Sequence, residues 1–437
     1  MSRQYTIFNQ QSDAPPFWLS QRDRSFQPNT LAHWLKQYGS PLLVYSEDSL
    51  HALVTSFKEF CAASGRHTQI AFALKACPNL SILRLFHAYG LLIEVNSAQE
   101  YRIALDAGFQ PQQIHINGVA KNTELIDLAI LKGCRALHLD SVEEIDIIAA
   151  RVVANGSRLA VQLRISPDVG VALAPGLMTG QLQSPFGVAL QDLPMAWQAL
   201  RRHRKHLILQ GLHVHTGSGG DLEAIYPQLI DVMQAALADS VAALPEQELE
   251  VNFGGGFISD PQHLFKVKGA ASILKQINRL PSNTALMFEP GRFLVEYAAG
   301  LYCRVAALKR KADLNWVFLD AGYSHLSDRA IVGVRFPLRA LRESKDDRLT
   351  RVAGPLCDSV DIYQSSESGI NGFNLPTDLQ CGEVIEIACT GAYVHSTGNH
   401  FAGFCQPAVL LVGIDGQARL IRRAEQYQDL CVLELGL

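Results

Sequence analysis

Short apolar runs alternate with longer amphipathic stretches over residues 41–289, and this alternation most limits how the chain can fold. The runs typical of strands are residues 41–45, 69–74, 91–95, 114–117, 136–140, 159–165, 207–215, 249–253 and 285–289. Helix-like segments lie between them, at residues 48–63, 80–87, 97–107 and 142–154. Strand–helix–strand units repeated in this way predict a parallel sheet, and about eight units close a (β/α)8 barrel. An open, doubly wound sheet remains the alternative.

The alternation stops after Gly300, and the pattern of the C-terminal third is different. Strand-like segments at residues 306–308, 316–319, 383–389 and 408–412 are separated by Gly, Asp and Ser, which is typical of a β-rich domain. The N-terminal stretch has no strong period and contains the breaker Pro15-Pro16. We therefore predict a lead-in over residues 1–40 that packs with the β-domain, a barrel over residues 41–300, and a C-terminal β-rich barrel or sandwich over residues 301–437.

The composition is that of a well-buried globular protein, with 48% apolar and 18% charged residues. A net charge of -4 gives no electrostatic reason to expect nucleic acid or an anionic membrane as a partner. The nine cysteines, an odd number in a chain of this size, predict reduced thiols. They form no C-x-x-C pair and no Cys/His spacing typical of zinc, so we expect no metal site. The polar N-terminus lacks the apolar core of a signal peptide, and no apolar run reaches the roughly 20 residues that span a bilayer. We expect a cytoplasmic protein.

Polar residues that follow the predicted barrel strands are the candidates for chemistry, because barrel active sites lie at the carboxyl ends of strands. Lys75 follows the run 69–74, where partial burial would leave its amine nucleophilic for a Schiff base. Taken singly, a lysine just past a strand is more often simply exposed to solvent. His213 and His215 share one face of a strand, and either can be a hydrogen-bonded residue of the barrel. Gly254-Gly255-Gly256 would let backbone amides approach an anion, although such runs also form plain tight turns.

Further candidates are charged or reactive side chains later in the chain. Glu289, in Glu289-Pro290-Gly291-Arg292, closes the last barrel strand and needs a cationic partner, which a protonated pyridine nitrogen, Arg292 or Arg164 would supply. In the β-domain, Cys357 and Asp358 place a thiol beside a carboxylate, and Tyr393 follows the strand-like segment 383–389. Spacing alone does not tie these residues to the barrel.

Taken in this order, from residue 41 to residue 404, the motifs resemble the fold-type III pyridoxal-phosphate (PLP) decarboxylases, which include the diaminopimelate, ornithine/lysine and arginine enzymes. The resemblance implies an alanine-racemase-type barrel that carries PLP, a C-terminal β-domain that completes the site, and a head-to-tail homodimer with shared active sites. It also implies an amino acid substrate, with neither nucleic acid nor membrane as a partner.

The resemblance assigns a role to each motif. Lys75 corresponds to the Schiff-base lysine, Glu94 stands where the family usually has Asp, and Arg164 corresponds to an arginine near the cofactor ring. His215 corresponds to the histidine on the ring face and Glu289 to the acid paired with the pyridine nitrogen. The phosphate site would comprise Ser218, Gly254, Gly255, Gly256, Gly291, Arg292 and Tyr393. Cys357 corresponds to the thiol that protonates the product, and it would enter with Asp358 from the partner subunit.

The reaction and the substrate are inferred from individual positions. Related racemases place an arginine against the pyridine nitrogen, so Glu289 favours decarboxylation, and the retained Lys75 and Cys357 argue against a non-catalytic regulator. Diaminopimelate enzymes usually have Glu after the cysteine and an Arg-Pro after the Asp-Ala-Gly turn, whereas this chain has Asp358 and Asp328-Arg329. We therefore expect a substrate with a distal amine, either ornithine- or lysine-like or an intermediate of a siderophore or antibiotic pathway, and take Asp358, Tyr323 and Arg329 as its candidate ligands. Diaminopimelate is the alternative.

Overall fold

The computed structural model describes residues 19, 26–169, 179–218, 221–244, 249–260, 263, 265–365 and 372–435. Internal contacts divide the chain into two compact units. The barrel unit comprises Val54–Asp260 and Lys266–Gly291, and the β unit comprises Met1–Leu53, Pro261–Phe265 and Arg292–Leu437. The sequence-based domain ranges, which follow chain order, remain predictions. Among the described residues, no helix combines the length and the apolar character needed to cross a membrane.

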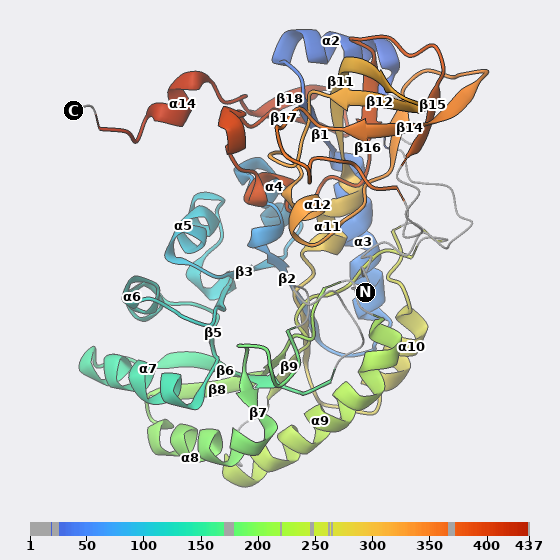
Figure 1. Cartoon of the computed structure of the whole chain (residues 1–437). Helices are drawn as coiled ribbons and strands as arrows, with labels where there is room; N and C mark the ends of the chain where they lie inside the picture. Colours follow the sequence, from blue (N-terminus) through green and yellow to red (C-terminus); the bar gives the residue numbers. More distant parts are fainter. Residues whose placement is uncertain are drawn as a thin grey trace. The chain divides into compact units, whose positions relative to one another are not determined.

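The barrel unit contains a closed ring of eight parallel strands (Figure 1). In order around the ring they are β2 (Thr68–Ala73), β3 (Leu92–Val95), β4 (Ile114–Ile116), β5 (Ala136–Leu139), β6 (Leu159–Ser166), β8 (Leu207–Val214), β9 (Glu250–Asn252) and β10 (Leu286–Phe288). The ring closes because β10 pairs with β2, and the short β7 (Val188–Ala189) pairs with β6 outside it. The predicted (β/α)8 barrel with a separate β-rich domain is confirmed.

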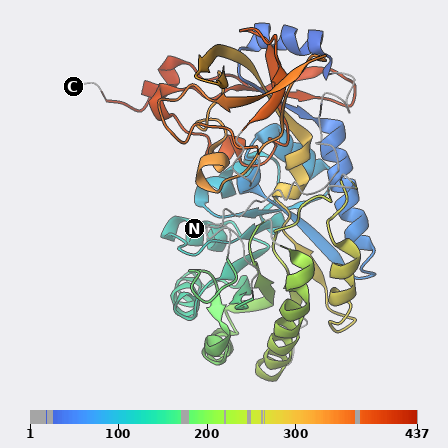
Figure 2. The same ribbon diagram turned by 45° about the vertical axis from the view of Figure 1, so that its right-hand side comes forward.

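Helices follow most of the strands and lie outside the ring, as both views show (Figures 1 and 2). They are α3 (Glu47–Ala62), α4 (Leu80–Ala88), α5 (Ala98–Asp106), α6 (Thr123–Leu131), α7 (Val142–Ala154), α8 (Leu193–His203), α9 (Leu222–Ala243) and α10 (Ala270–Ile277), with 3-10 turns η2 (Leu74–Ala76), η3 (Pro111–Gln113) and η5 (Leu190–Asp192). Several begin at side-chain caps: Asn79 accepts from the amides of residues 81 and 82, and Ser97 and Ser141 each accept from the amide three residues on. These caps fix where the chain turns back after a strand.

The interior of the ring is unusually polar for this fold, whose barrels are commonly filled with branched apolar side chains. On β3, β4, β5 and β8, polar residues alternate with buried apolar ones, as strand geometry allows. Buried polar residues on or just after the strands are Glu94, His115, Asn117, His138, Asp140, Gln162, Arg164, His213, Glu250, Asn252 and Glu289. Such groups are costly to bury without partners, so their contacts indicate where the barrel does chemistry.

The β unit is built around one sheet in which β15–β14–β12–β11–β1–β17–β18 are neighbours in that order, with β16 pairing both β11 and β13. The strands are β1 (Leu42–Ser46), β11 (Ala299–Lys311), β12 (Leu314–Leu319), β13 (Leu338–Ala340), β14 (Asp347–Ala353), β15 (Phe373–Pro376), β16 (Val384–Ile387), β17 (Ala408–Val412) and β18 (Ala418–Arg422). Its helices and 3-10 turns are α2 (Pro28–Tyr38), α11 (Arg292–Val295), η6 (Glu296–Ala298), α12 (Ser327–Ile331), α13 (Val394–Thr397), η7 (Phe401–Gly403) and α14 (Tyr427–Cys431).

One strand lies in a different sheet from the one its pattern suggested. The run 41–45 begins the alternation of the sequence, but it forms β1, which pairs with β11 and β17 and not with a strand of the ring. Every residue of β1 is buried. A fully buried apolar strand looks the same in either kind of sheet, so its pattern cannot assign it to one of them.

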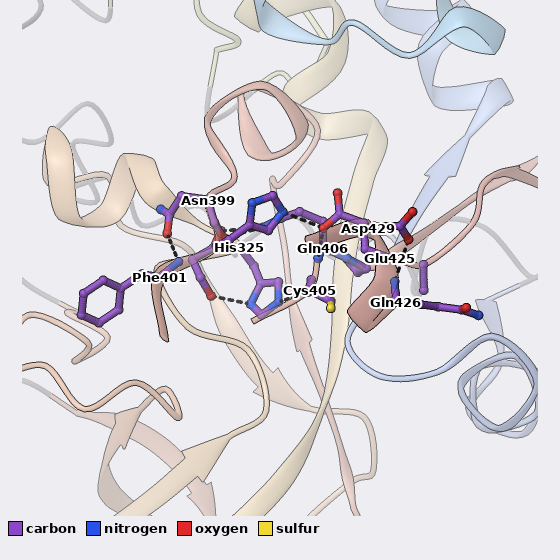
Figure 3. A network of polar contacts seen from close by, with 12 residues as sticks. His325, Asn399, Phe401, Cys405, Gln406, Glu425, Gln426 and Asp429 are labelled. Atoms are coloured by element: carbon purple, nitrogen blue, oxygen red, sulfur yellow. Dashed lines mark hydrogen bonds and ion pairs between the residues drawn. The ribbon is translucent and has the colours of Figure 1, made fainter. Parts of the chain in front are cut away.

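Loops of the β unit are held together by a network of polar contacts (Figure 3). The ring nitrogen Nε2 of His325 lies 3.2 Å from the carbonyl oxygen of Cys405, and Gln406 Nε2 donates to the carbonyl of Asn399 at 2.8 Å. The amide of Gln406 donates to Glu425 Oε2 at 2.8 Å. These contacts tie the turn after β12 to the segments on either side of β17 and β18.

Candidate active site

Lys75 and Glu94 face each other at the ends of adjacent strands. Lys75 lies in η2, directly after β2, and its Nζ is 3.7 Å from Oε2 of Glu94 at the end of β3. The Lys75 side chain is 46% exposed and that of Glu94 is 0% exposed. Burial raises the pKa of Glu94, and the nearby Lys75 charge partly opposes that rise. The pair therefore presents an accessible amine beside a desolvated carboxyl group.

Glu289 lies just after β10, with several barrel groups directed at its carboxylate. Asn252 Nδ2 donates to Oε1 at 2.8 Å, and Nε2 of His213 lies 3.3 Å from Oε2. Burial raises the pKa of Glu289, and the Asn252 hydrogen bond and the charges of Lys75 and Arg164 oppose that rise. A buried carboxylate in these surroundings would be stabilised further by a cationic group such as a protonated pyridine nitrogen.

Arg164, on β6, has its ion pair with Asp140 rather than with Glu289. Its Nη1 lies 3.4 Å from Asp140 Oδ1 and donates to Asn117 Oδ1 at 3.4 Å. The guanidinium also stands over the ring of Phe186, 4.5 Å from the ring centroid. Arg164 is thus fixed in the barrel beside Glu289 without being its main partner.

The triple-glycine segment, residues 254–256, packs closely against the backbone around His215. The amide of Gly255 donates to Nδ1 of His215 at 3.2 Å, so that nitrogen is an acceptor; burial holds the pKa of His215 well below its usual value. Gly254 and Gly256 have φ of +63° and +95°, and a Cβ on Gly256 would lie 2.4 Å from the carbonyl oxygen of Gly217. Only glycine fits this segment. Ser218 follows, half-buried, three residues after His215.

Gly291 lies against the Lys75 turn. A Cβ there would be 3.1 Å from the Cβ atoms of both Ala73 and Ala76, on either side of Leu74-Lys75. The chain after β10 therefore packs closely on the turn that carries Lys75. These barrel residues lie at or near the carboxyl ends of the eight ring strands, with Asn117 directly after β4 and Asp140 directly after β5, as expected for this fold.

These residues fit PLP by their chemistry. PLP needs an amine for its aldehyde, a counter-charge for its ring nitrogen and backbone amides for its phosphate. Lys75 supplies the amine, and Glu289 supplies a buried carboxylate. The glycine segment 254–256 supplies backbone that no side chain can cover. In addition, neither carboxylate oxygen of Glu94 accepts a hydrogen bond from a described residue, which leaves buried acceptors for a ligand.

The β unit holds Cys357, Asp358 and Tyr323 close to one another. Cys357 and Asp358 are exposed in the turn after β14, and the Tyr323 hydroxyl donates to Asp358 Oδ2 at 3.1 Å. Two of the three candidate substrate ligands therefore lie together. The third, Arg329, is buried: its guanidinium carbon lies 3.9 Å from the ring centroid of Tyr363, and its Nη2 is 2.5 Å from Asp361 Oδ1.

Arg292 and Tyr393 also lie together in the β unit. The Arg292 guanidinium stands 4.8 Å from the centroid of the Tyr393 ring. The same guanidinium pairs with Glu296 at 3.1 Å and with Asp328 at 3.2 Å. Tyr393 has a φ of +65°, a conformation that costs energy for a residue with a side chain. Arg292 is therefore already balanced by two carboxylates.

Sequence reasoning missed the residues that hold these groups in place. Asn252 contacts Glu289 and accepts from the amide of Gly254 at 2.9 Å, while Asp140 pairs with Arg164. Each is a polar residue at the end of an apolar strand, and that signal was visible. Asp361, by contrast, accepts from the amides of Tyr323 and Leu356, each at 2.9 Å, and no local pattern marks it.

Known proteins resemble the chain over nearly its whole length. The family model described as pyridoxal-dependent decarboxylase, pyridoxal binding domain, matches residues 50–296. Diaminopimelate decarboxylase of Escherichia coli is 31% identical, covering 96% of this chain and 100% of that protein. The Zymomonas mobilis enzyme of the same name is 28% identical, covering 95% and 97% respectively.

Among solved structures, diaminopimelate decarboxylase of Helicobacter pylori, complexed with L-lysine, superposes with a TM-score of 0.80 at 25% identity and covers 92% of this chain and 99% of its own. The matching family model and the relatives agree with the PLP-compatible residues of the barrel. The chain therefore belongs to the fold-type III PLP-dependent decarboxylases and is an amino acid decarboxylase, a carboxy-lyase that uses PLP.

Proposed function

We propose that the substrate is a diamino acid and that diaminopimelate is the first candidate. The names of the E. coli and Z. mobilis relatives support this, as does the L-lysine in the H. pylori structure, because loss of one CO2 from diaminopimelate gives lysine. Our sequence-based ranking put ornithine- or lysine-like substrates first, and the comparisons favour its alternative. The observation that carries the proposal is the 31% identity over the full length of a diaminopimelate decarboxylase.

In this proposal the barrel residues hold the cofactor. Lys75 would bind its aldehyde, Glu289 its ring nitrogen, His215 its ring, and residues 254–256 with Ser218 and Gly291 its phosphate. Tyr393 would add to the phosphate site, and so would Arg292 through its backbone amide, since its guanidinium already pairs with Glu296 and Asp328. When bound, PLP supplies an electron sink for the pair left on the α-carbon as CO2 departs. Glu94 and Arg164 would set the charge around Lys75 and the ring.

The proton that replaces CO2 comes, in this proposal, from Cys357 or Lys75. A general acid must reach the α-carbon and hold its proton at working pH. The exposed Cys357 thiol suits this role sterically. By family resemblance, Cys357 of one subunit enters the active site of the other. We therefore propose a head-to-tail homodimer with shared sites.

A distal ammonium group would be recognised by Asp358, oriented by the Tyr323 hydroxyl at 3.1 Å. The other carboxylate oxygen of Asp358, Oδ1, accepts from the amide of Val360 at 3.0 Å, and each carboxylate oxygen keeps a further lone pair for an ammonium donor. This recognition serves every diamino acid, diaminopimelate included.

A second candidate is an amino acid with a distal amine but no second carboxylate, and one observation favours it. A distal carboxylate requires a cation that is not already neutralised. In the segment where the diaminopimelate pattern expects Arg-Pro, this chain has Asp328, which pairs with Arg292, and Arg329, which pairs with Asp361. Both arginines are therefore already paired with carboxylates of the chain, which favours a substrate without a second carboxylate.

A CO2-release screen separates the two candidates. The purified holoenzyme is assayed with diaminopimelate, lysine, ornithine and 2,3-diaminopropionate, with Lys75→Ala as the inactive control. Diaminopimelate should give the highest kcat/KM, and Asp358→Ala should lower kcat/KM for every substrate that carries a distal amine. Turnover of lysine or ornithine without turnover of diaminopimelate would establish the second candidate instead.

A further inference from the structure

Three histidines form a column inside the barrel, beneath the carboxyl ends of the strands. His115 on β4, His138 on β5 and His213 on β8 are all fully buried. The rings of His138 and His213 have centroids 4.5 Å apart and are tilted by 32°, and the ring of His115 meets that of His138 edge-on at 5.7 Å. Three imidazoles in the space that branched apolar residues usually fill need an explanation.

The column ends at Glu289. Nε2 of His213 lies 3.3 Å from Oε2 of Glu289, and Nε2 of His138 lies 3.9 Å from Oε1. The carboxylate is also held by Asn252 at 2.8 Å. Glu289 is thus contacted from within the barrel by side chains of three strands that do not carry it, β5, β8 and β9.

Burial favours the neutral form of all three imidazoles of the column. Burial, reinforced by the Arg164 charge, holds the pKa of His138 and of His213 well below the usual value, and the neighbouring histidines lower the pKa of His138 further. Burial lowers the pKa of His115 to about 3. A neutral imidazole has one N–H donor and one acceptor. An ionised Glu289 only accepts, so the 3.3 Å contact then places the N–H of a neutral His213 on Nε2, directed at Glu289.

We propose that His213, held in orientation by the ring of His138, is a positioning residue that keeps Glu289 in place as the carboxylate that pairs with the cofactor's ring nitrogen. This rests on the proposed role of Glu289. A neutral N–H donor stabilises the charged form of a buried carboxylate without adding a cation that would compete with the pyridinium. The ring of His138 limits how far the His213 ring can turn.

A bound metal ion is the rival explanation of the same cluster. One ligand atom from each of His138, His213 and Glu289 lies within 4.8 Å of the other two, and all three residues are buried. An ion there would occupy the carboxylate that our proposal reserves for the ring nitrogen. The two explanations therefore make opposite predictions about metal content.

The test compares PLP with its 1-deaza analogue, in which carbon replaces the ring nitrogen. The apparent Kd of each is measured by fluorescence quenching on the full-length apo chain, and the ratio of the two Kd values reports the contact with the ring nitrogen. His213→Met, which keeps the volume but removes the donor, should lower this preference for PLP about tenfold, the usual effect of losing a hydrogen bond to a charged group. His213→Gln, which keeps an N–H at similar reach, should stay within about threefold of wild type.

Further variants separate the possible outcomes. Glu289→Gln should also lower the preference; if it does not, the role of Glu289 is wrong. If Glu289→Gln lowers the preference but His213→Met weakens both ligands equally, our inference is wrong and His213 is only structural. His138→Ala should lower the preference, whereas His138→Phe, which keeps a flat ring, should not.

Two controls complete the test. His206→Met makes the same change at a half-buried histidine outside the column, whose Nδ1 lies 3.4 Å from the carbonyl of Ser157, and it should leave the preference unchanged. If His213→Met fails to fold by circular dichroism, His213→Gln compared with the shorter His213→Asn carries the same test. Stoichiometric metal in the purified chain, whose removal changes the Kd ratio, would overturn the proposal.

Discussion

Replacing Asp361 by alanine should destabilise the β unit strongly, because this one carboxylate joins three segments. It is 1% exposed, accepts from the amides of Tyr323 and Leu356 at 2.9 Å each, and pairs with Arg329 at 2.5 Å. Its own carbonyl accepts from the amide of Gly354 at 2.9 Å, which closes the turn that carries Cys357.

The magnitude follows from what the substitution leaves behind. Arg329 is 7% exposed, so Asp361→Ala strands a buried guanidinium, and removing one partner of a buried ion pair costs about 3–5 kcal/mol. Two backbone amides also lose their acceptor, at about 1 kcal/mol each where water can enter. Because these effects share one site they do not add fully, and we expect a loss of about 4 kcal/mol.

Urea unfolding followed by circular dichroism measures this loss. Asp358→Ala, three residues earlier in the same turn and exposed, is the matched control and should cost less than about 1 kcal/mol. Adding Arg329→Met to Asp361→Ala removes the stranded charge and should recover about 2 kcal/mol. A loss below about 1 kcal/mol for Asp361→Ala, or no recovery in the double variant, would refute the reasoning.

Three further predictions concern the barrel and the shared site. Gly256→Ala should weaken PLP binding at least about tenfold in a spectral titration, because its Cβ would lie 2.4 Å from a carbonyl oxygen, while Gly90→Ala, with φ of +76° and nothing within 4 Å, should bind normally. Mixing Lys75→Ala and Cys357→Ala subunits should restore up to about a quarter of wild-type CO2 release, since half of random dimers are mixed and each has one intact site; no recovery after confirmed exchange would exclude shared sites. The pKa of His115 is lowered by burial to about 3, below the value near 6.5 in the unfolded chain, so its contribution to stability is present above pH 6.5 and is lost as pH falls toward 3. As pH falls through that window, wild type should therefore lose unfolding free energy relative to His115→Phe, by up to about 1.4 kcal/mol per pH unit. A difference between the two proteins that does not change with pH would contradict a neutral His115.

The fold class could be predicted from sequence because the alternation of strands and helices is long and regular. The structure confirms the barrel and the β-rich domain, but β1 shows the limit of the method. Its buried apolar run fits a barrel strand as well as a strand of the other sheet, and only its pairing with β11 and β17 decides between them.

For the candidate site too, some features could be predicted from the sequence and others could not. Lys75, His215, Glu289 and residues 254–256 stood out because polar residues and glycines at strand ends contrast with their apolar surroundings. The ion pairs between these side chains could not be predicted from the sequence. Arg164 pairs with Asp140 and Arg329 with Asp361, and both pairs depend on contacts between segments far apart in the chain. The roles carried over from the family remain predictions until they are measured.

Identification of the lysine that binds the cofactor tests the central claim most directly. The holoenzyme is reduced with sodium borohydride, digested, and mapped by peptide mass spectrometry, with Lys121→Ala as a control for the buried lysine that pairs with Glu144 in the same barrel. We predict a phosphopyridoxyl adduct on the peptide that contains Lys75, in wild type and in Lys121→Ala alike. An adduct on another lysine, or none on a chain that retains PLP, would contradict the account.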